Sequence, residues 1–423
     1  MSSQPESALP AEQRPNALPG HRTGRGLDLL ALICLILIAS SLRPAASSLG
    51  PVLSELKTAY SLLEWQTGLL TALPGMVFAI CGFIAVPVLR RVGLFASLVI
   101  ACSFVIVGVG GRVLTDQWLG FAGLTVVALA GMSIGNVILP VYVKTRFPDR
   151  PSLGATAFTV SLGLGAMFPA LLTAPIAGHF DDWRIGLGVW ALVPVGALVT
   201  WIVLRLAGSV PNLRQRAPES HEVAPPRRHI FTSRKAMYMA MFFGLQSANA
   251  YVQFGWLPQV YRDAGLDPVL AGLMLTIVTL GGLPGGFLAP QIIMRSILPR
   301  FFLVTFAVSA VLGYLGLLLA PAATPVLWAI LLSYGGFAFP AALALITGRT
   351  RDVSVTARTS AFVQSSGYVL AAIGPLAVGG LLGFSGGWSV PLSLMVGVSA
   401  LMGVTGFLAA SPGTVDEELA EHR

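Results

Sequence analysis

The sequence predicts an all-α membrane protein of twelve transmembrane helices, arranged as two parallel six-helix repeats. Composition is the first reason: hydrophobic residues make up 55% of the 423 residues and charged residues only 10%. Soluble domains carry about 25% charged residues, so this composition excludes a soluble globular protein. The number of apolar runs and an internal repeat are the second and third reasons.

Twelve apolar runs have about the 20-residue length that a helix needs to cross a bilayer. They fall near residues 29–51, 65–89, 94–112, 118–142, 152–176, 185–206, 236–258, 269–293, 301–320, 324–347, 358–382 and 388–410. We expect a disordered N-terminal tail, a first bundle, a linker, a second bundle and a C-terminal tail. Their predicted ranges are 1–26, 27–206, 207–235, 236–410 and 411–423.

The second bundle repeats the first. A shift of 204 residues lays TAFTVSLG (156–163) on SAFVQSSG (360–367), with four of eight positions identical. The same shift lays Gly68 on Gly272 and Gly131 on Gly335. Because six helices separate each pair, both copies enter the membrane in the same direction. Such parallel repeats are typical of secondary transporters.

The basic residues predict the orientation, because cytoplasmic loops carry an excess of Lys and Arg. With both termini in the cytoplasm, 21 of the 26 Lys and Arg residues fall on the cytoplasmic side. The outer side then holds Lys57, Arg112, Arg184 and Arg262. The net charge of +8 therefore reflects topology, and no nucleic-acid partner is expected. We expect a multi-pass protein of the cytoplasmic (inner) membrane, surrounded by lipid.

Arg43 is the candidate for the centre of a functional site. It lies in the first apolar run, in which no other residue from 29 to 51 is charged. An arginine at that depth costs at least about 2.5–3.5 kcal/mol. All 18 acidic residues fall in tails, loops or helix ends, so Arg43 could serve as counter-charge for an anion. Alternatively, it extends to the outer interface or donates to free carbonyls near Pro44.

Polar side chains inside other runs are further candidates. In the seventh run, polar and aromatic residues recur at steps of three and four and so share one helix face. The residues are Gln246, Asn249, Gln253 and Trp256. A second stripe holds Ser360, Gln364 and Tyr368, and the fourth run contains Asn136. Amides facing lipid are costly, so we expect the seventh-run face to look inward. The alternative is interhelical hydrogen bonding.

Three stretches resemble the cyanate/2-nitroimidazole transporter branch of the major facilitator superfamily. They are LRPAASSLGPVL (42–53), NVILPVYVKTRFP (136–148) and FFGLQSANAYVQFGWLPQVYRDAGLDPVLAG (242–272). The resemblance runs from the first span to the twelfth. It implies the major facilitator fold and a secondary transporter, with Arg43, Asn136, Gln246, Ser247 and Tyr251 in the solute site. LRRVGLF (89–95) departs from the superfamily pattern, because Arg90 stands where an acidic residue is usual.

Two functions stay open. One is transport of a small anionic or nitrogen-containing solute, cyanate-like, by alternating access, with Arg43 as counter-charge. The other is export of small neutral heterocycles, nitroimidazole-like, with Tyr251, Phe254 and Trp256 as stacking walls. No Asp, Glu or His lies in the middle of a span. This leaves facilitated diffusion, or symport in which a proton travels on or beside the solute. Asp28 and Glu64, at the mouths of the first and second spans, are the alternative coupling groups.

An enzyme is not expected, because the chain lacks a nucleophile–base pair, a phosphate-binding loop and metal-ligand spacing. The three cysteines, Cys34, Cys81 and Cys102, are scattered among the apolar runs. We therefore expect neither a cofactor nor a metal ion. The partners expected are the small-molecule solute, with or without a proton, and the lipid bilayer. We expect a monomer.

The topology can be tested with single cysteines. We expect Asp182→Cys to react with an impermeant maleimide added to intact cells, because the loop after the fifth span faces outward. Ser220→Cys, in the linker, should react only after the cells are permeabilised. The opposite pattern would overturn the predicted orientation.

Overall fold

The computed structural model describes residues 25–147, 150–208, 229–296 and 298–420. Most of the predicted N-terminal tail (1–26) and most of the linker (207–235) therefore lie outside the described residues. The described residues contain helices and no strand, as the composition predicts. We call residues 25–208 the N half and residues 229–420 the C half.

The helices follow the predicted spans closely. In the N half they are α1 (Arg25–Ser41), α2 (Pro44–Ser47), α3 (Leu53–Tyr60), α4 (Glu64–Arg112), α5 (Trp118–Arg146), α6 (Pro151–Phe180), α7 (Trp183–Gly188) and α8 (Leu192–Leu206). In the C half they are α9 (Arg234–Asp263), α10 (Pro268–Gly281), α11 (Leu283–Arg295), α12 (Pro299–Leu319), α13 (Pro325–Gly335), α14 (Ala338–Gly348), α15 (Val353–Ser385), α16 (Ser389–Ala409) and α17 (Val415–Ala420). Short 3-10 turns include η1 (Gly50–Val52).

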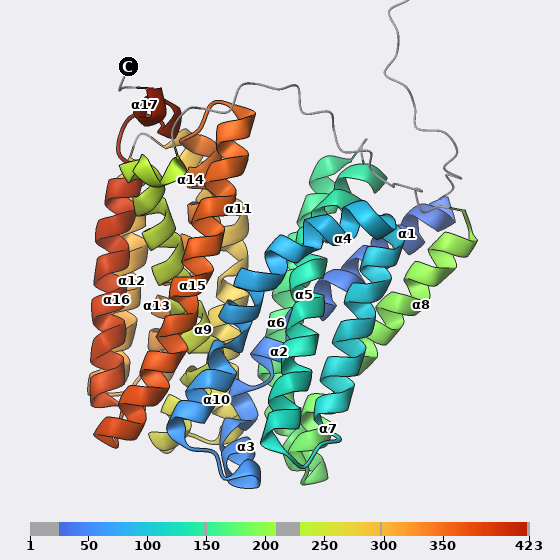
Figure 1. Cartoon of the computed structure of the whole chain (residues 1–423). Helices are drawn as coiled ribbons and strands as arrows, with labels where there is room; N and C mark the ends of the chain where they lie inside the picture. The colour runs from blue at the N-terminus through green and yellow to red at the C-terminus, as the bar shows by residue number, and fades with distance from the viewer. Residues whose placement is uncertain (1–24, 148–149, 209–228, 297, 421–423) are drawn as a thin grey trace, which may run out of the picture.

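Ten helical segments of the described residues are long and apolar enough to cross a membrane. The other two predicted spans, 65–89 and 236–258, correspond to the first part of α4 and to α9. Both run between the two ends of the molecule alongside the other helices (Figure 1). The buried amides Gln246, Asn249 and Gln253 explain why α9 is less apolar than its neighbours.

Several long helices are interrupted at Gly or Pro. Within α4, Gly93 has φ 79°, a left-handed conformation that glycine adopts without strain, and the chain turns there from the second span into the third. The first span breaks between Ser41 and Pro44, since proline lacks an N–H and disfavours helix at the preceding residue. It is therefore not one continuous helix. The eighth span breaks at Gly282 between α10 and α11.

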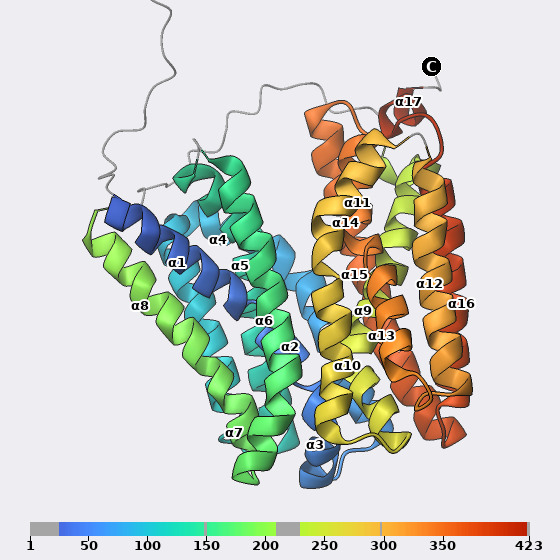
Figure 2. The same cartoon turned by 180° about the vertical axis from the view of Figure 1, so that it is seen from behind.

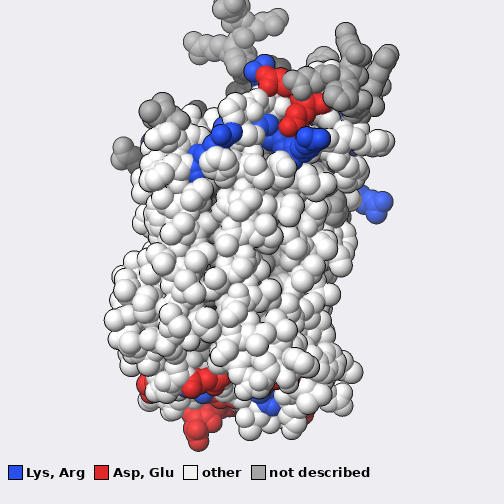
Figure 3. Space-filling model, turned by 90° about the vertical axis from the view of Figure 1, so that its left-hand side faces the viewer, with Lys and Arg blue, Asp and Glu red and all other residues white. Residues whose placement is uncertain are grey.

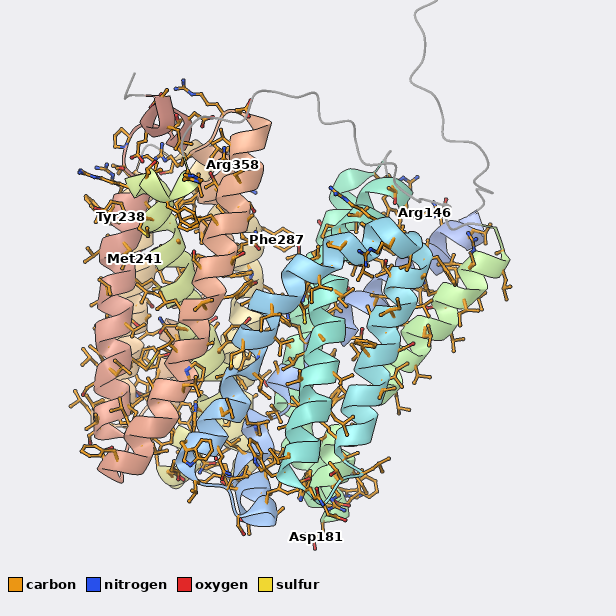
Figure 4. All side chains as sticks on the ribbon, viewed as in Figure 1. Arg146, Asp181, Tyr238, Met241, Phe287 and Arg358 are labelled. Atoms are coloured by element: carbon orange, nitrogen blue, oxygen red, sulfur yellow. The ribbon has the colours of Figure 1, made fainter. Side chains whose placement is uncertain are left out.

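The two halves stand side by side, and α8 ends and α9 begins at the same end of the molecule (Figures 1 and 2). We call this the linker end, and the opposite end, which carries α3, the α3 end. Charged side chains gather toward the two ends, with a broad uncharged band between them (Figure 3). Arg146 and Arg358 lie at the linker end and Asp181 at the α3 end (Figure 4).

Glycines bring the helices of the two halves into backbone contact. A Cβ added to Gly68 of α4 would lie 3.1 Å from the Cα of Gly379 of α15. About two helical turns farther along α4, a Cβ on Gly75 would lie 3.0 Å from the backbone nitrogen of Ala372. Small residues allow this close approach in membranes, where dispersion contacts drive helix association. The halves therefore meet tightly along α4 and α15.

A polar cluster joins the halves at the α3 end, and we call it the latch: Ser54, Glu55, Gln259 and Arg262. Arg262 donates to both carboxylate oxygens of Glu55, at 2.9 and 3.0 Å, and to the Pro51 carbonyl at 3.1 Å. Ser54 donates to the Gln259 side chain at 2.6 Å. Such two-pronged arginine–carboxylate pairs are geometrically specific. The latch thus holds the C half's α9 against the N half's α3 and η1.

The C-terminal segment, predicted as a tail (411–423), is partly folded onto the C half. Lys235, at the start of α9, donates to the Ser411 and Pro412 carbonyls at 2.8 and 3.0 Å. Glu418 of α17 accepts from Ser233 at 2.6 Å. Glu418 also accepts from the backbone N–H of Lys235 at 3.0 Å, at the end of α9 that carries partial positive charge.

The latch can be tested by charge reversal. We expect Arg262→Glu to separate the halves at the α3 end, because two carboxylates would then face each other. The reporter is the alkylation rate of Thr71→Cys, in a chain without native cysteines, since Thr71 is 3% exposed and packs on Gly255. Loss of a pair worth about 1 kcal/mol predicts labelling about fivefold faster. The double reversal, Glu55→Arg with Arg262→Glu, should restore the slow rate. Equal rates in all three proteins would rule the latch out.

Candidate functional site

The break in the first span exposes backbone groups in the middle of the molecule, and Arg43 sits at this break. Arg43 is the residue before α2, with φ −129° and ψ −28°. Its carbonyl accepts from the backbone N–H of Ala46 at 3.0 Å and of Ser47 at 3.1 Å. Broken helices of this kind line solute sites in other transporters, because irregular backbone is tolerated only where it faces protein or a cavity.

Arg43 lines a small pocket between the two halves. The pocket is formed by α2 and the residues before it, α4, α6 and α9. Its lining residues are Leu42, Arg43, Ala46, Ser47, Pro74, Phe78, Ala166, Tyr251 and Phe254. Arg43 is the one charged residue among them, and most of the others are apolar. The pocket therefore presents a single positive charge within an apolar, aromatic wall.

Among the described residues, Arg43 forms no ion pair. The carboxylates closest to the ends of the first two spans are already paired: Asp28 with Arg146 at 2.6 Å and Glu64 with Lys57 at 2.6 Å. The hydroxyl-bearing side chain of Tyr251 lines the same pocket as Arg43. Arg43 therefore keeps a positive charge that no described protein carboxylate neutralises.

Aromatic side chains from both halves continue the wall around the pocket. The rings of Phe78 and Tyr368 meet edge to face with centroids 6.1 Å apart. Tyr368 packs in the same way on Phe243, at 5.1 Å. Sequence reasoning placed Tyr368 only at the end of a polar stripe and gave no signal for Phe78, Pro74 or Ala166. These residues look like ordinary apolar span residues until the halves are brought together.

The predicted polar face of α9 is turned away from this pocket. Asn249 accepts from Ser399 of α16 at 3.1 Å, and Gln253 donates to the Tyr314 hydroxyl of α12 at 3.3 Å. Trp256 is fully buried, and its ring lies 5.8 Å from that of Trp388. Tyr251 is two residues from Asn249 and Gln253, so it projects from the opposite side of the helix. The structure thus brings Arg43 and Tyr251 together and keeps Asn249, Gln253 and Trp256 apart from them.

Those three α9 side chains belong instead to the interior of the C half. Gln253 and Trp256 line a second small pocket there, between α9, α12, α15 and α16. The Trp256 indole N–H is buried without a hydrogen-bond partner among the described residues. Asn249 and Gln253 hold α9 against its neighbours by interhelical hydrogen bonds, which is the alternative interpretation of this face. Trp256 contributes by packing, without a hydrogen bond to the described residues.

The remaining predicted residues occupy separate places. Gln246 donates to Ser247 at 2.6 Å, and Gln364 donates to Ser360 at 2.8 Å. Asn136 of α5 has a buried amide nitrogen without a hydrogen-bond partner among the described residues. Its neighbour Gly135 faces Leu42, since a Cβ there would lie 2.5 Å from the Leu42 side chain. Asn136 therefore follows a residue, Gly135, that packs against the broken first span.

Comparisons with known proteins agree with this architecture. Residues 29–337 match the Major Facilitator Superfamily. The chain is 31% identical to the 2-nitroimidazole transporter of Escherichia coli (strain K12), over 78% of this chain and 83% of that protein. It is 27% identical to the cyanate transport protein of the same organism, over 68% of this chain and 74% of that protein.

A solved structure shares the fold. The nucleoside transporter NupG (D323A mutant) superposes with a TM-score of 0.71 and 12% identity, covering 91% of this chain and all of that chain (100%). This likeness shows the fold, and the family match and the relatives show a transporter rather than an enzyme. The chain belongs to the Major Facilitator Superfamily, in the branch of the cyanate and 2-nitroimidazole transporters.

Proposed function

We propose that this transporter moves a small monovalent anion, cyanate-like in size and charge, across the membrane by alternating access. Arg43 is the counter-charge in this proposal, and Tyr251 and Phe254 are walls of the site. The names of the two E. coli relatives support a small nitrogen-containing solute. The unpaired guanidinium in the pocket between the halves is the observation that carries the proposal.

The charge balance of the pocket favours a monovalent anion. One guanidinium in an apolar surround attracts an anion more strongly than it would in water. It also offers two parallel donors, which a lysine cannot reproduce. The pocket's other polar side chains, Ser47 and Tyr251, are too few to replace the hydration shell of a multiply charged ion. A weakly hydrated, single negative charge fits this chemistry best.

Transport of small neutral heterocycles is the second candidate, and the aromatic wall is the observation that favours it. Phe78, Tyr251 and Phe254 line the pocket, and Tyr368 packs on Phe78. Aromatic rings stack favourably on one another at such distances. Trp256, first considered a third stacking wall, is not part of this proposal because it packs inside the C half.

The transport cycle we propose opens the two ends in turn. The latch and the glycine contacts of α4 and α15 close the α3 end. In the proposed cycle, the structure is therefore the state in which the α3 end is closed. We propose that the linker end faces the cytoplasm in the inner membrane, and that the protein works as a monomer. A proton would travel with the solute, because the paired carboxylates Asp28 and Glu64 lie near helix ends rather than at the depth of Arg43.

Removing the charge tests the anion proposal directly. We expect Arg43→Gln to abolish cyanate uptake into proteoliposomes, because no other pocket residue carries a positive charge. Arg43→Lys should recover only part of the uptake, since lysine keeps the charge but loses the two-pronged geometry.

A neutral solute and a distant arginine supply the controls. Uptake of 2-nitroimidazole, if carried, should survive Arg43→Gln better than uptake of cyanate. Arg184→Gln should leave both unchanged, because Arg184 pairs with Asp116 at the α3 end. Undiminished cyanate uptake by Arg43→Gln would refute the anion proposal. Uptake of 2-nitroimidazole but not of cyanate by the unaltered protein would favour the second candidate.

A second test distinguishes the roles of the two faces of α9. We expect Phe254→Ala to raise the KM for the solute with little change in melting temperature, because Phe254 lines the pocket. Trp256→Ala should instead lower stability by about 3–5 kcal/mol, the usual cost of truncating a buried tryptophan. Melting curves in detergent and uptake kinetics measure the two effects. If the Trp256→Ala protein is stable but does not take up the solute, Trp256 lines the solute path.

A further inference from the structure

A second arginine lies buried near the broken first span. Arg112, the last residue of α4, is 0% exposed, although its position at the edge of an apolar run suggests a loop cation. Among the described residues it has no carboxylate partner. The acidic residues near that end, Glu55 and Asp116, pair with Arg262 and Arg184. A fully buried cation without an ion pair is costly to maintain, so its contacts are informative.

The guanidinium of Arg112 contacts the short helix α2. One terminal nitrogen donates to the Ala45 carbonyl at 3.2 Å and the other to the Ser48 hydroxyl at 3.1 Å. Ser48 in turn donates to the Pro44 carbonyl at 2.6 Å. The Arg112 Cζ lies 5.6 Å from the centroid of the Phe121 ring, and its Nε is buried without a hydrogen-bond partner in the described part of the chain. Arg112 thus binds one backbone carbonyl and one hydroxyl of the segment that follows the break.

The same short helix fixes the backbone of Arg43. The helix has only four residues, Pro44–Ser47, and a helix of that length is not stable on its own. The Arg43 carbonyl accepts from the first turn of α2, and the Ser47 hydroxyl donates to it at 3.3 Å. Arg43 is therefore held at one end of α2 and Arg112 at the other. Removing the Arg112 guanidinium therefore removes the hydrogen bonds that hold α2 at its Ser48 end.

We propose that Arg112 is a positioning residue of the anion site: it anchors α2 so that Arg43 faces the pocket, and thereby sets anion affinity. This inference rests on the proposed function of Arg43 but concerns a residue outside the pocket. Arg112 does not touch the solute. Removing it weakens solute binding and leaves the later steps of the cycle in place, so KM rises while Vmax is largely retained.

The first readout is uptake of cyanate into proteoliposomes, with equal amounts of inserted protein. We expect Arg112→Gln to raise KM about tenfold, the usual effect of losing a hydrogen bond to a charged group. Arg112→Lys should rescue most of this loss, because an ammonium can also donate to Ala45 and Ser48. Arg184→Gln, an exposed arginine at the same end, is the matched control and should leave KM unchanged.

The second readout follows α2 itself and needs no solute. Ser47 lines the pocket but is only 1% exposed, so a thiol in its place should react slowly with N-ethylmaleimide. We expect Ser47→Cys, in a chain with Cys34, Cys81 and Cys102 replaced by alanine, to be alkylated several-fold faster when Arg112→Gln is added. Ser48→Ala removes one Arg112 contact with a milder change. It should raise KM in the same direction and be less than additive with Arg112→Gln.

The outcomes separate the two proposals. Unchanged KM and unchanged alkylation in both Arg112→Gln and Ser48→Ala would overturn the role of Arg112, even if Arg43→Gln abolishes uptake. If Arg112→Gln does not insert, Ser48→Ala decides by the same criteria. If the wild-type protein carries no cyanate, the proposed function fails, and the alkylation rate alone decides whether Arg112 anchors α2.

Discussion

The main constraint on this molecule is that a positive charge must be held at the depth of an apolar slab without a protein carboxylate beside it. Breaking the first span at Pro44 meets part of this constraint, because the break lets Arg43 leave the helix surface and face a pocket between the halves. The cost of the break is a set of free carbonyls. A second arginine, Arg112 of α4, donates to the Ala45 carbonyl and the Ser48 hydroxyl beside the break, so a second buried positive charge accompanies the first. Aromatic rings accompany both arginines: Phe78, Tyr251 and Phe254 line the pocket with Arg43, and the Phe121 ring lies beside Arg112.

Much of the fold was predictable because its determinants are local. Twelve apolar runs of span length, an internal shift of 204 residues and one-sided basic loops follow from sequence alone. Arg43 was also detectable, since a charge in an apolar run is conspicuous. The helices that pack against a given helix face were not predictable from the sequence. The spacing showed that Asn249 and Gln253 share a face of α9, but not that α12 and α16 cover that face. Arg112 illustrates the same limit, because the last residue of a span and the first residue of a loop look identical in sequence.

Contacts between the halves divide into two kinds with different consequences. The glycine contacts of α4 and α15 are apolar and close, so they act over short distances and vanish when the helices separate by a small amount. The latch is polar and can exchange its hydrogen bonds for water as it opens, which lowers the cost of separation. An interface built from both kinds favours two discrete arrangements rather than a continuous range. This property is what alternating access requires of the pair of halves.

The docked helix α17 sets an order of events during synthesis. The start of α9 is made long before α17, yet the Lys235 ammonium donates to residues 411 and 412, and Ser233 donates to Glu418. Until that stretch leaves the ribosome, the first turn of α9 keeps a buried lysine without its acceptors. The second half therefore cannot complete its packing while it is being inserted. A nascent chain that stops short of α17 would present this unfinished helix start to the quality-control machinery of the cell.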